Sequence, residues 1–239
     1  MTVQFLAAEV RAPDAGPAEA PILHPLSLEL GESRIAVIGA NGSGKSTLLR
    51  LINGLLLPSA GSVSVDGADT ARRGSLVRRR VGFVFTDPLS QLVMPTGRDD
   101  VELSLRRTVR SAAERRAAAE RVLDRFGLLG LADRSIYDLS GGERQLMALA
   151  AVLATEPDIL VADEPSTLLD LRNTARLRTI LAGLSQQVIY TTHDLDFAAD
   201  AQRVLVVDGG RIVQDGPPGE SIAAYRRLAA GEPTGLRAE

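Results

Sequence analysis

The chain has 239 residues and a formal net charge of −3, with 45% hydrophobic side chains, 3% aromatic ones and no cysteine. The acidic balance and the few aromatic rings argue against a nucleic-acid-binding surface, and the lack of cysteine excludes disulfides, thiol catalysis and cysteine-ligated metals. No charged start with a signal-length apolar core and no membrane-length apolar run is present. We therefore expect a cytoplasmic chain that reaches a membrane only through partners.

Hydrophobic periodicity in the first part of the chain predicts three strands and one long loop. Residues 3–7 alternate weakly, as in an edge strand, and residues 11–25 carry four prolines and a glycine, which indicates a loop. Residues 26–30 alternate strictly and predict a half-buried strand. Residues 35–38 are apolar throughout, which is typical of a buried central strand.

A glycine-rich stretch, GANGSGKST at 39–47, separates this buried strand from a helical pattern that ends near residues 53–54. This context is that of a phosphate-binding loop, in which backbone N–H groups and the helix dipole face an anion. Lys45, the only lysine, would reach the β- and γ-phosphates, and the Ser46 hydroxyl would bind Mg²⁺. A turn without ligand is the alternative, but the complete string favours a nucleoside triphosphate. The candidate binding residues are Gly39, Asn41, Gly42, Ser43, Gly44, Lys45, Ser46 and Thr47.

The rest of the chain alternates between strands and helices, which indicates an α/β fold with a parallel sheet covered on both faces. Strands are predicted at residues 62–67, 81–85, 159–162, 188–191 and 204–207, and helices within 87–153 and at 171–184 and 223–230. We predict a single domain (1–239). Its parts would be a nucleotide-binding core (1–86 and 154–216), a helical insert (87–153) and a C-terminal helix with a frayed tail (217–239).

Two adjacent carboxylates, Asp163 and Glu164, follow the predicted buried strand 159–162. Neighbouring residues on a strand face opposite sides, so the two side chains are expected to have different tasks. Asp163 would hold hydrated Mg²⁺, and Glu164 would orient and polarise the water that attacks the γ-phosphate. A solvated pair at a strand end is the alternative, and Lys45 upstream favours the catalytic interpretation.

A second anion-binding helix terminus is predicted at residues 139–143, LSGGE. Ser140 is a suitable N-cap, and Gly141 and Gly142 leave backbone N–H groups open at the start of a helix. Because the helical insert separates this turn from the phosphate loop, two copies arranged head to tail could each close over the other's γ-phosphate. The pattern predicts a nucleotide-sandwich dimer, whereas Ser-Gly-Gly alone would indicate only a capped surface helix.

His193 follows the predicted strand 188–191, at the edge where open α/β sheets bind ligands. An imidazole there could hydrogen-bond the γ-phosphate and respond to its loss, and a structural role is the alternative. His24, in the proline-rich loop, is interpreted as a surface residue.

Together these motifs resemble the ATP-binding cassette (ABC) ATPases over about residues 5–216. The matching motifs are Walker A (39–47), the signature (139–143, with Glu143), Walker B with its catalytic glutamate (159–164), the D-loop (167–170, with Asp170) and the switch histidine (His193). The resemblance implies ATP and Mg²⁺ as cofactors. It also implies a RecA-like P-loop NTPase core with a parallel sheet, an antiparallel edge subdomain and a helical signature subdomain.

The chain departs from the family pattern at two places. Thr86 stands where the family has the Q-loop glutamine, and its short hydroxyl makes a reach to Mg²⁺ and the attacking water doubtful. Gln91 lies further along the same loop, and we do not move the role to it. The family's adenine-stacking aromatic is missing near residues 12–13, so base selectivity is expected to be weak unless Arg11 covers the ring.

Within the family, the loop at 87–96 is similar to that of energy-coupling-factor (ECF) vitamin and metal importers, with the biotin type most similar and cobalt or nickel types next. The similarity implies a second ATPase subunit, a membrane T component that docks beside this loop, and a small substrate-binding membrane subunit. The chain would sit at the cytoplasmic face of the cell membrane, with no nucleic-acid partner.

Two other functions remain open at this point. A soluble ABC ATPase acting on nucleic acid would carry long coiled coils, whereas this insert is short and lacks heptads or a basic face. The arginine-rich segment 72–80 is the one local basic feature, interpreted as solvated surface. A poorly hydrolysing partner in a heterodimer is suggested by Thr86 and opposed by the presence of Glu164 and His193.

Overall fold

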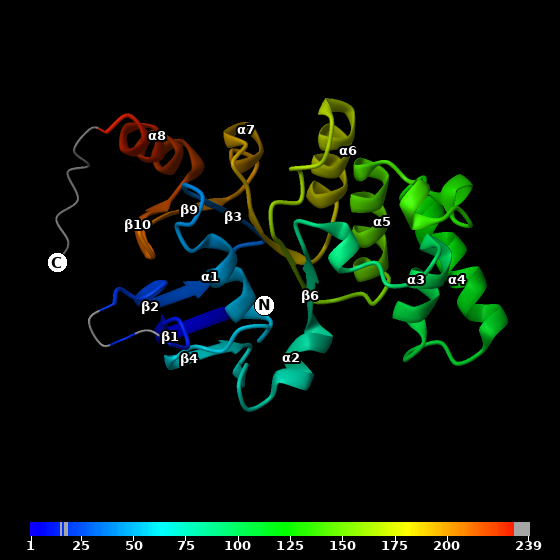
Figure 1. Cartoon of the computed structure of the whole chain (residues 1–239), viewed down its shortest axis with the longest axis horizontal. Helices are drawn as coiled ribbons and strands as arrows, with labels where there is room; N and C mark the ends of the chain where they lie inside the picture. The colour runs from blue at the N-terminus through cyan, green and yellow to red at the C-terminus, as the bar shows by residue number, and fades with distance from the viewer. Residues whose placement is uncertain (15, 17–18, 232–239) are drawn as a thin grey trace.

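The computed structural model describes residues 1–14, 16 and 19–231, and its strands form two sheets (Figure 1). The first is antiparallel, in the order β2 (Leu23–Leu30), β1 (Val3–Val10), β4 (Ala60–Val65), β5 (Ala68–Asp69). The second has the order β10 (Arg211–Gly216), β9 (Arg203–Asp208), β3 (Arg34–Ile38), β8 (Gln187–Thr191), β7 (Ile159–Ala162), β6 (Val81–Val84). The frayed tail expected at 233–239 lies outside the described residues.

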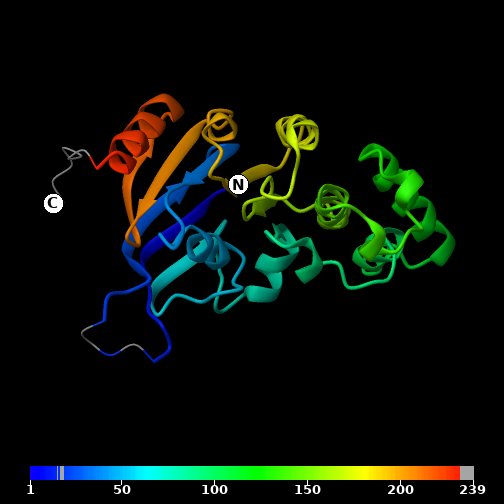
Figure 2. The same ribbon diagram turned by 45° about the horizontal axis from the view of Figure 1, so that its top comes forward.

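Helices cover both sheets. They are α1 (Lys45–Ile52), α2 (Gly74–Arg80), α3 (Gly97–Leu105), α4 (Ala112–Arg125), α5 (Gly141–Leu153), α6 (Leu171–Ala182), α7 (Leu195–Ala198) and α8 (Pro218–Ala229), with short 3₁₀ turns η1 (Pro88–Ser90), η2 (Leu129–Leu131) and η3 (Ile136–Asp138). Figures 1 and 2 show α3 and α4 at the end of the molecule away from α8. In the part of the chain that the structure describes, no helix has the length and apolarity to span a bilayer.

The six-stranded sheet is parallel except at one edge. β3 runs parallel to β8 and β9, β7 runs parallel to β6 and β8, and β10 pairs antiparallel with β9. The carboxyl ends of the parallel strands therefore lie along one edge of the sheet, where α/β proteins bind their ligands. The loops that follow β3, β6, β7 and β8 bring the phosphate loop, Thr86, the Asp163–Glu164 pair and His193 to this edge, whereas the predicted signature residues lie at the start of α5. The expected α/β class with a parallel sheet is confirmed.

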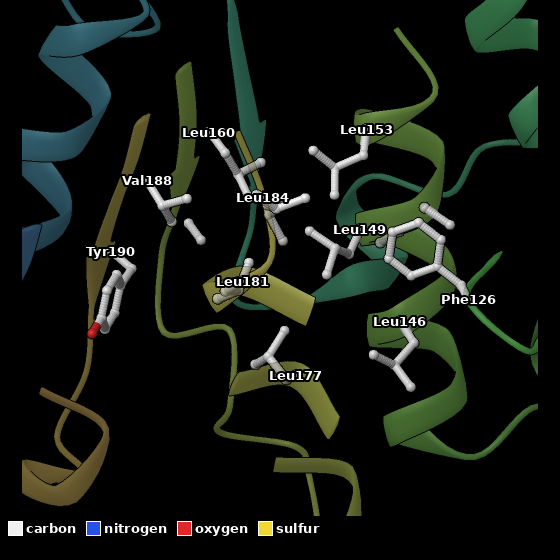
Figure 3. Packing of buried hydrophobic residues seen from close by; sticks show 14 of the residues in the cluster. Phe126, Leu146, Leu149, Leu153, Leu160, Leu177, Leu181, Leu184, Val188 and Tyr190 are labelled. Atoms are coloured by element: carbon white, nitrogen blue, oxygen red, sulfur yellow. The ribbon is translucent and has the colours of Figure 1, made fainter. Parts of the chain in front are cut away.

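Both faces of this sheet are buried, which explains the unbroken apolar runs of its strands. Along β3, Ile35 and Val37 join a cluster that contains the apolar face of α1, whereas Ala36 and Ile38 join a cluster that contains α5 and α6. Figure 3 shows this second cluster, in which leucines of α5 and α6 pack with residues of β7 and β8. The labelled side chains are Phe126, Leu146, Leu149, Leu153, Leu160, Leu177, Leu181, Leu184, Val188 and Tyr190.

The N-terminal strands differ from the prediction in two respects. β1 pairs with both β2 and β4, so the expected edge strand at residues 3–7 is an interior strand. β2 begins at Leu23, so Pro25 lies within a strand and the expected loop 11–25 is shorter. Proline has no N–H to donate but is tolerated at a sheet edge, and β2 is the edge strand of its sheet.

The C-terminal region contains more regular structure than predicted. β10 gives no clear sequence signal because its side chains are half-buried or exposed on both faces. α8 begins at Pro218 rather than near residue 223. Proline fits the first turn of a helix, because its φ is already helical and an N–H there has no partner within the helix.

Candidate active site

The glycine-rich loop between β3 and α1 adopts a backbone that only glycine accepts readily. Gly39, Gly42 and Gly44 have φ values of +151°, +77° and +107°. A Cβ on Gly39 would lie 2.1 Å from the carbonyl oxygen of Val207, so a side chain there would clash with β9. α1 starts directly after this loop, at Lys45. The backbone N–H groups of its first turn, which have no partner within the helix, therefore lie beside the loop.

Lys45 is buried, with 6% of its surface exposed, and its ammonium group lies against the loop. Its Nζ donates hydrogen bonds to the carbonyl oxygens of Gly39 (2.9 Å) and Ala40 (3.0 Å). Both acceptors are neutral, so an anionic phosphate oxygen would form a stronger, charge-assisted bond with the same donor. The loop, the helix N-terminus and this lysine together fit a polyphosphate.

Two oxygen groups suited to a divalent cation meet beside α1. The Ser46 hydroxyl donates to Oδ1 of Asp163 at 2.9 Å, and Asp163 is 2% exposed. Mg²⁺ prefers hard oxygen ligands and is usually held by one or two protein groups together with water and substrate phosphates. The donor set therefore fits Mg²⁺.

The neighbouring carboxylate, that of Glu164, points toward His193 and not toward Ser46. Its Oε2 lies 2.9 Å from Nδ1 of His193, and the Thr167 hydroxyl donates to the same oxygen at 3.4 Å. The Glu164 side chain is 15% exposed and that of His193 is 64% exposed, so the imidazole faces solvent and the carboxylate lies beneath it. A carboxylate in this position can accept a proton from a water molecule while the histidine holds its orientation.

Glu164 also has an unusual backbone, with φ at +49°. The left-handed region costs about 1–2 kcal/mol for a residue with a side chain, and such strain persists where the surroundings fix it. Its N–H donates to Oγ1 of Thr191 at 2.7 Å, and that hydroxyl in turn donates to Oδ1 of Asp163 at 2.8 Å. Sequence reasoning missed Thr191: the sequence shows a hydroxyl at the end of a predicted strand, but only the structure shows that this strand pairs with the one that precedes Asp163.

Thr86 also turns toward this backbone. Its hydroxyl donates to the carbonyl oxygen of Asp163 at 3.0 Å. Oε1 of Gln91 accepts from the backbone N–H of Phe85 at 3.3 Å, so this side chain is engaged with its own loop.

The predicted signature turn forms the N-terminus of α5. Ser140 accepts from the N–H of Glu143, and the Glu143 carboxylate accepts from the N–H of Ser140 at 2.7 Å, which is a complete capping box. Hydrogen bonding from Ser140 to this carboxylate, chiefly from the backbone N–H, lowers the pKa of Glu143. Glu143 therefore serves as a cap, and the turn's capacity for an anion rests on its backbone N–H groups and the helix dipole.

The signature turn packs against the predicted D-loop. A Cβ on Gly142 would lie 3.3 Å from Cδ2 of Leu169 in the D-loop and 3.1 Å from Nδ2 of Asn173 at the start of α6, so a larger residue would press on both. Asp170 caps that helix by accepting from the N–H of Asn173 at 2.8 Å. α5 and α1 belong to clusters on opposite faces of the six-stranded sheet, and Figure 1 shows them well separated. The structure thus joins the signature to the D-loop and keeps it apart from the phosphate loop.

Arg11, the candidate for covering a base, is held elsewhere. Its Nε lies 2.7 Å from Oε1 of Glu9, and its Nη1 donates to the carbonyl oxygen of Glu19 at 3.1 Å. The sequence has no aromatic residue between Phe5 and Phe83 to take its place.

Known proteins with similar sequences carry ABC names. A family model described as ABC transporter matches residues 23–167. The biotin transport ATP-binding protein BioM of Rhizobium etli is 50% identical over 208 residues, which cover 87% of this chain and 92% of that protein. BioM of Rhodobacter capsulatus is 40% identical over 204 residues, 85% of this chain and 87% of that protein.

Solved structures of similar fold point to the same family. CbiO1 of Clostridium perfringens, part of the ABC transporter complex CbiONQ, has a TM-score of 0.80 at 28% identity, covering 95% of this chain and 93% of that one. A dimeric post-hydrolysis state of the ATP-binding cassette MJ0796, bound to ADP and Pi, has a TM-score of 0.81 at 28% identity, covering 90% and 98%. The expected ABC ATPase fold and the resemblance to biotin-type ATPases are confirmed. The chain belongs to the ABC transporter family, as a subunit that binds and hydrolyses ATP.

Proposed function

We propose that this ATPase energises an ECF-type importer of a micronutrient, with biotin as the favoured solute and cobalt or nickel next. The observation that carries the proposal is the 50% identity to a biotin transport ATP-binding protein over 87% of the chain. The likeness to CbiO1, a subunit of a larger transporter complex, supports the same class. The chain would then be a single ATPase domain attached peripherally to the cytoplasmic face of the cell membrane.

In this proposal the phosphate loop holds ATP through its N–H groups and Lys45. Ser46 and Asp163 would hold Mg²⁺, which would neutralise negative charge on the triphosphate. Glu164 orients the attacking water and accepts its proton. His193, hydrogen-bonded to Glu164 at 2.9 Å and open to solvent, would hold the orientation of the carboxylate and could reach the γ-phosphate.

A second ATPase subunit would complete the site. The N–H groups of Gly141 and Gly142 stand at the start of α5, a helix that packs on the face of the sheet opposite to α1. They would meet the γ-phosphate held by a neighbouring subunit, with the Asp170 loop between the two sites. The dimeric structure of MJ0796 supports an assembly of two subunits.

The loop at residues 87–96 is proposed to receive the membrane T component, which together with a small substrate-binding membrane subunit would complete the importer. Val93 is 69% exposed and Leu89 39% exposed, so apolar surface faces outward. Beneath them the buried Asp100 carboxylate accepts from the N–H groups of Val93 (3.0 Å) and Met94 (3.2 Å), and burial raises its pKa. A loop held in this way presents a fixed apolar surface to a partner helix.

Co-purification from native membranes tests the proposal. The tagged full-length chain should co-purify with two membrane proteins. Deletion of the gene for this chain should abolish uptake of labelled biotin by the cell. Val93→Asp should lose the membrane proteins and retain ATP binding, whereas Leu6→Asp, an equally exposed leucine on β1, should keep both. Purification without membrane proteins, together with a DNA gel shift, would refute the importer and favour the nucleic-acid function.

A further inference from the structure

The peptide unit that joins Asp163 to Glu164 is hydrogen-bonded on both of its sides by threonine hydroxyls. Its carbonyl oxygen accepts from Oγ1 of Thr86 at 3.0 Å. Its N–H donates to Oγ1 of Thr191 at 2.7 Å. The two threonines come from different strand ends, β6 and β8, which flank β7 in the sheet. The peptide is therefore held from both neighbouring strands.

The Thr191 hydroxyl makes a second bond that fixes its orientation. Thr191 is fully buried, and Oγ1 lies 2.8 Å from Oδ1 of Asp163. A hydroxyl has one hydrogen and two lone pairs, so it accepts from the Glu164 N–H and donates to the Asp163 carboxylate. One side chain thus connects the backbone of Glu164 to the carboxylate that also meets Ser46.

Glu164 requires such support because its φ of +49° is unfavourable for a residue with a Cβ. Strained backbones at functional sites persist when their surroundings determine them, and rotation of this peptide would break both threonine bonds. Rotation would also swing the Glu164 carboxylate away from His193, to which it is hydrogen-bonded at 2.9 Å. Two hydroxyls therefore maintain the geometry of both carboxylates.

We propose that Thr86 and Thr191 are positioning residues, which clamp the Asp163–Glu164 peptide so that Glu164 points at the attacking water. The inference rests on the proposed role of Glu164. In this inference Thr86 acts by holding the backbone carbonyl of Asp163, not by contacting Mg²⁺. A site with threonine at this position would then retain hydrolysis, because the threonine hydroxyl positions Glu164 by a contact that a glutamine at this position would not need to make.

Removal of each hydroxyl with little change of shape tests the clamp. In the purified full-length chain, Thr191→Val and Thr86→Val should each lower kcat about tenfold, roughly the loss of one hydrogen bond. The KM and Kd for ATP should stay within about twofold of the parent. Thr191→Ser and Thr86→Ser should restore kcat. Thr70→Val is the matched control, because Thr70 is 2% exposed and its hydroxyl has no partner among the described residues.

Two measurements separate positioning from other roles. Amide hydrogen exchange in the nucleotide-free protein should be faster at Glu164 in Thr191→Val and unchanged in Thr70→Val. The Mg²⁺ concentration for half-maximal activity should be unchanged in Thr86→Val, because the hydroxyl bonds the Asp163 carbonyl. A clear rise in that concentration would identify Thr86 as a metal ligand and overturn its assignment.

The clamp is wrong if folded Thr86→Val and Thr191→Val keep the parental kcat, or if serine fails to restore it. Thr86 is only half-buried, so Thr86→Val decides the matter should Thr191→Val not fold. Glu164→Gln distinguishes this failure from that of the proposed function. A native rate in Glu164→Gln refutes the role of Glu164 itself, whereas an inactive Glu164→Gln beside fully active threonine variants refutes only the clamp.

Discussion

The carboxyl edge of the six-stranded sheet and the N-terminus of α5, the two regions to which the proposal assigns phosphate binding, are held together differently. At the sheet edge, side chains distant in sequence meet: Ser46 and Asp163 are 117 residues apart and hydrogen-bonded. At α5, Ser140 and Glu143 cap the helix within a single turn. The first site depends on the whole fold, whereas the second is a local unit.

This difference suggests why one chain would not complete its own site. The capped turn at residues 140–143 belongs to the helical part α3–α5, which packs on the face of the sheet opposite to α1. A second copy could bring the two anion sites together without altering either. Perturbations should therefore act on chemistry and ATP binding at the sheet edge, and on subunit association and helix stability at α5.

The largest effect is expected at Glu164. Glu164→Gln should lower kcat by on the order of 10³-fold, because groups that act in the transition state of phosphoryl transfer contribute at that scale. ATP binding should persist, and size-exclusion chromatography with ATP should show accumulated dimer. Glu156→Gln is the control, since Glu156 shares the left-handed backbone (φ +50°) but is exposed and lies in the turn before β7. A strictly monomeric, ATP-loaded Glu164→Gln would contradict the two-copy arrangement.

Lys45→Ala should weaken ATP binding about 100-fold, because a charge-assisted hydrogen bond contributes about 2–3 kcal/mol. Isothermal titration with ATP measures the change. Arg50→Ala, an exposed cation in the last turn of the same helix, should bind ATP as the parent does. Equal affinity of Lys45→Ala and the parent would remove the phosphate loop from the nucleotide site.

Ser140→Ala separates the two tasks of the signature turn. Loss of the N-cap should destabilise the protein by about 1 kcal/mol, and hydrolysis should fall about tenfold if the turn contacts a phosphate in the neighbouring subunit. Ser111→Ala removes an equivalent cap, on α4, and should lower stability without lowering activity. Identical behaviour of the two variants in hydrolysis assays would reduce the signature turn to an ordinary capped helix.

The smallest effect concerns the charge of Glu143. Its pKa is lowered in the folded protein, from a usual value of 4.5, so its stabilisation is present above that value and is lost as pH falls through the lowered pKa. Glu143→Gln should therefore cost less than about 1 kcal/mol at pH 7, with the difference from the parent shrinking below pH 4.5. Urea unfolding of both proteins across this range measures it. A difference that is independent of pH would show that shape, not charge, matters there.

The sequence by itself determined which residue types are available to the site. A nine-residue phosphate loop, a carboxylate pair after a buried strand and a serine before two glycines are local patterns, because each depends on residue type and short spacing. The parallel sheet also followed from alternating strands and helices. Similar proteins then confirmed the family and the ABC fold.

Tertiary structure decided what depends on distant partners. β1 is an interior strand because β2 and β4 both pair with it. Pro25 fits into β2 because β2 is an edge strand, where a residue without an N–H group is tolerated. The contacts of Thr86 and Thr191 with the Asp163–Glu164 peptide arise only when β6, β7 and β8 lie side by side. Sequence periodicity shows which residues are buried but not which strands become neighbours, because pairing is settled by packing across the whole chain.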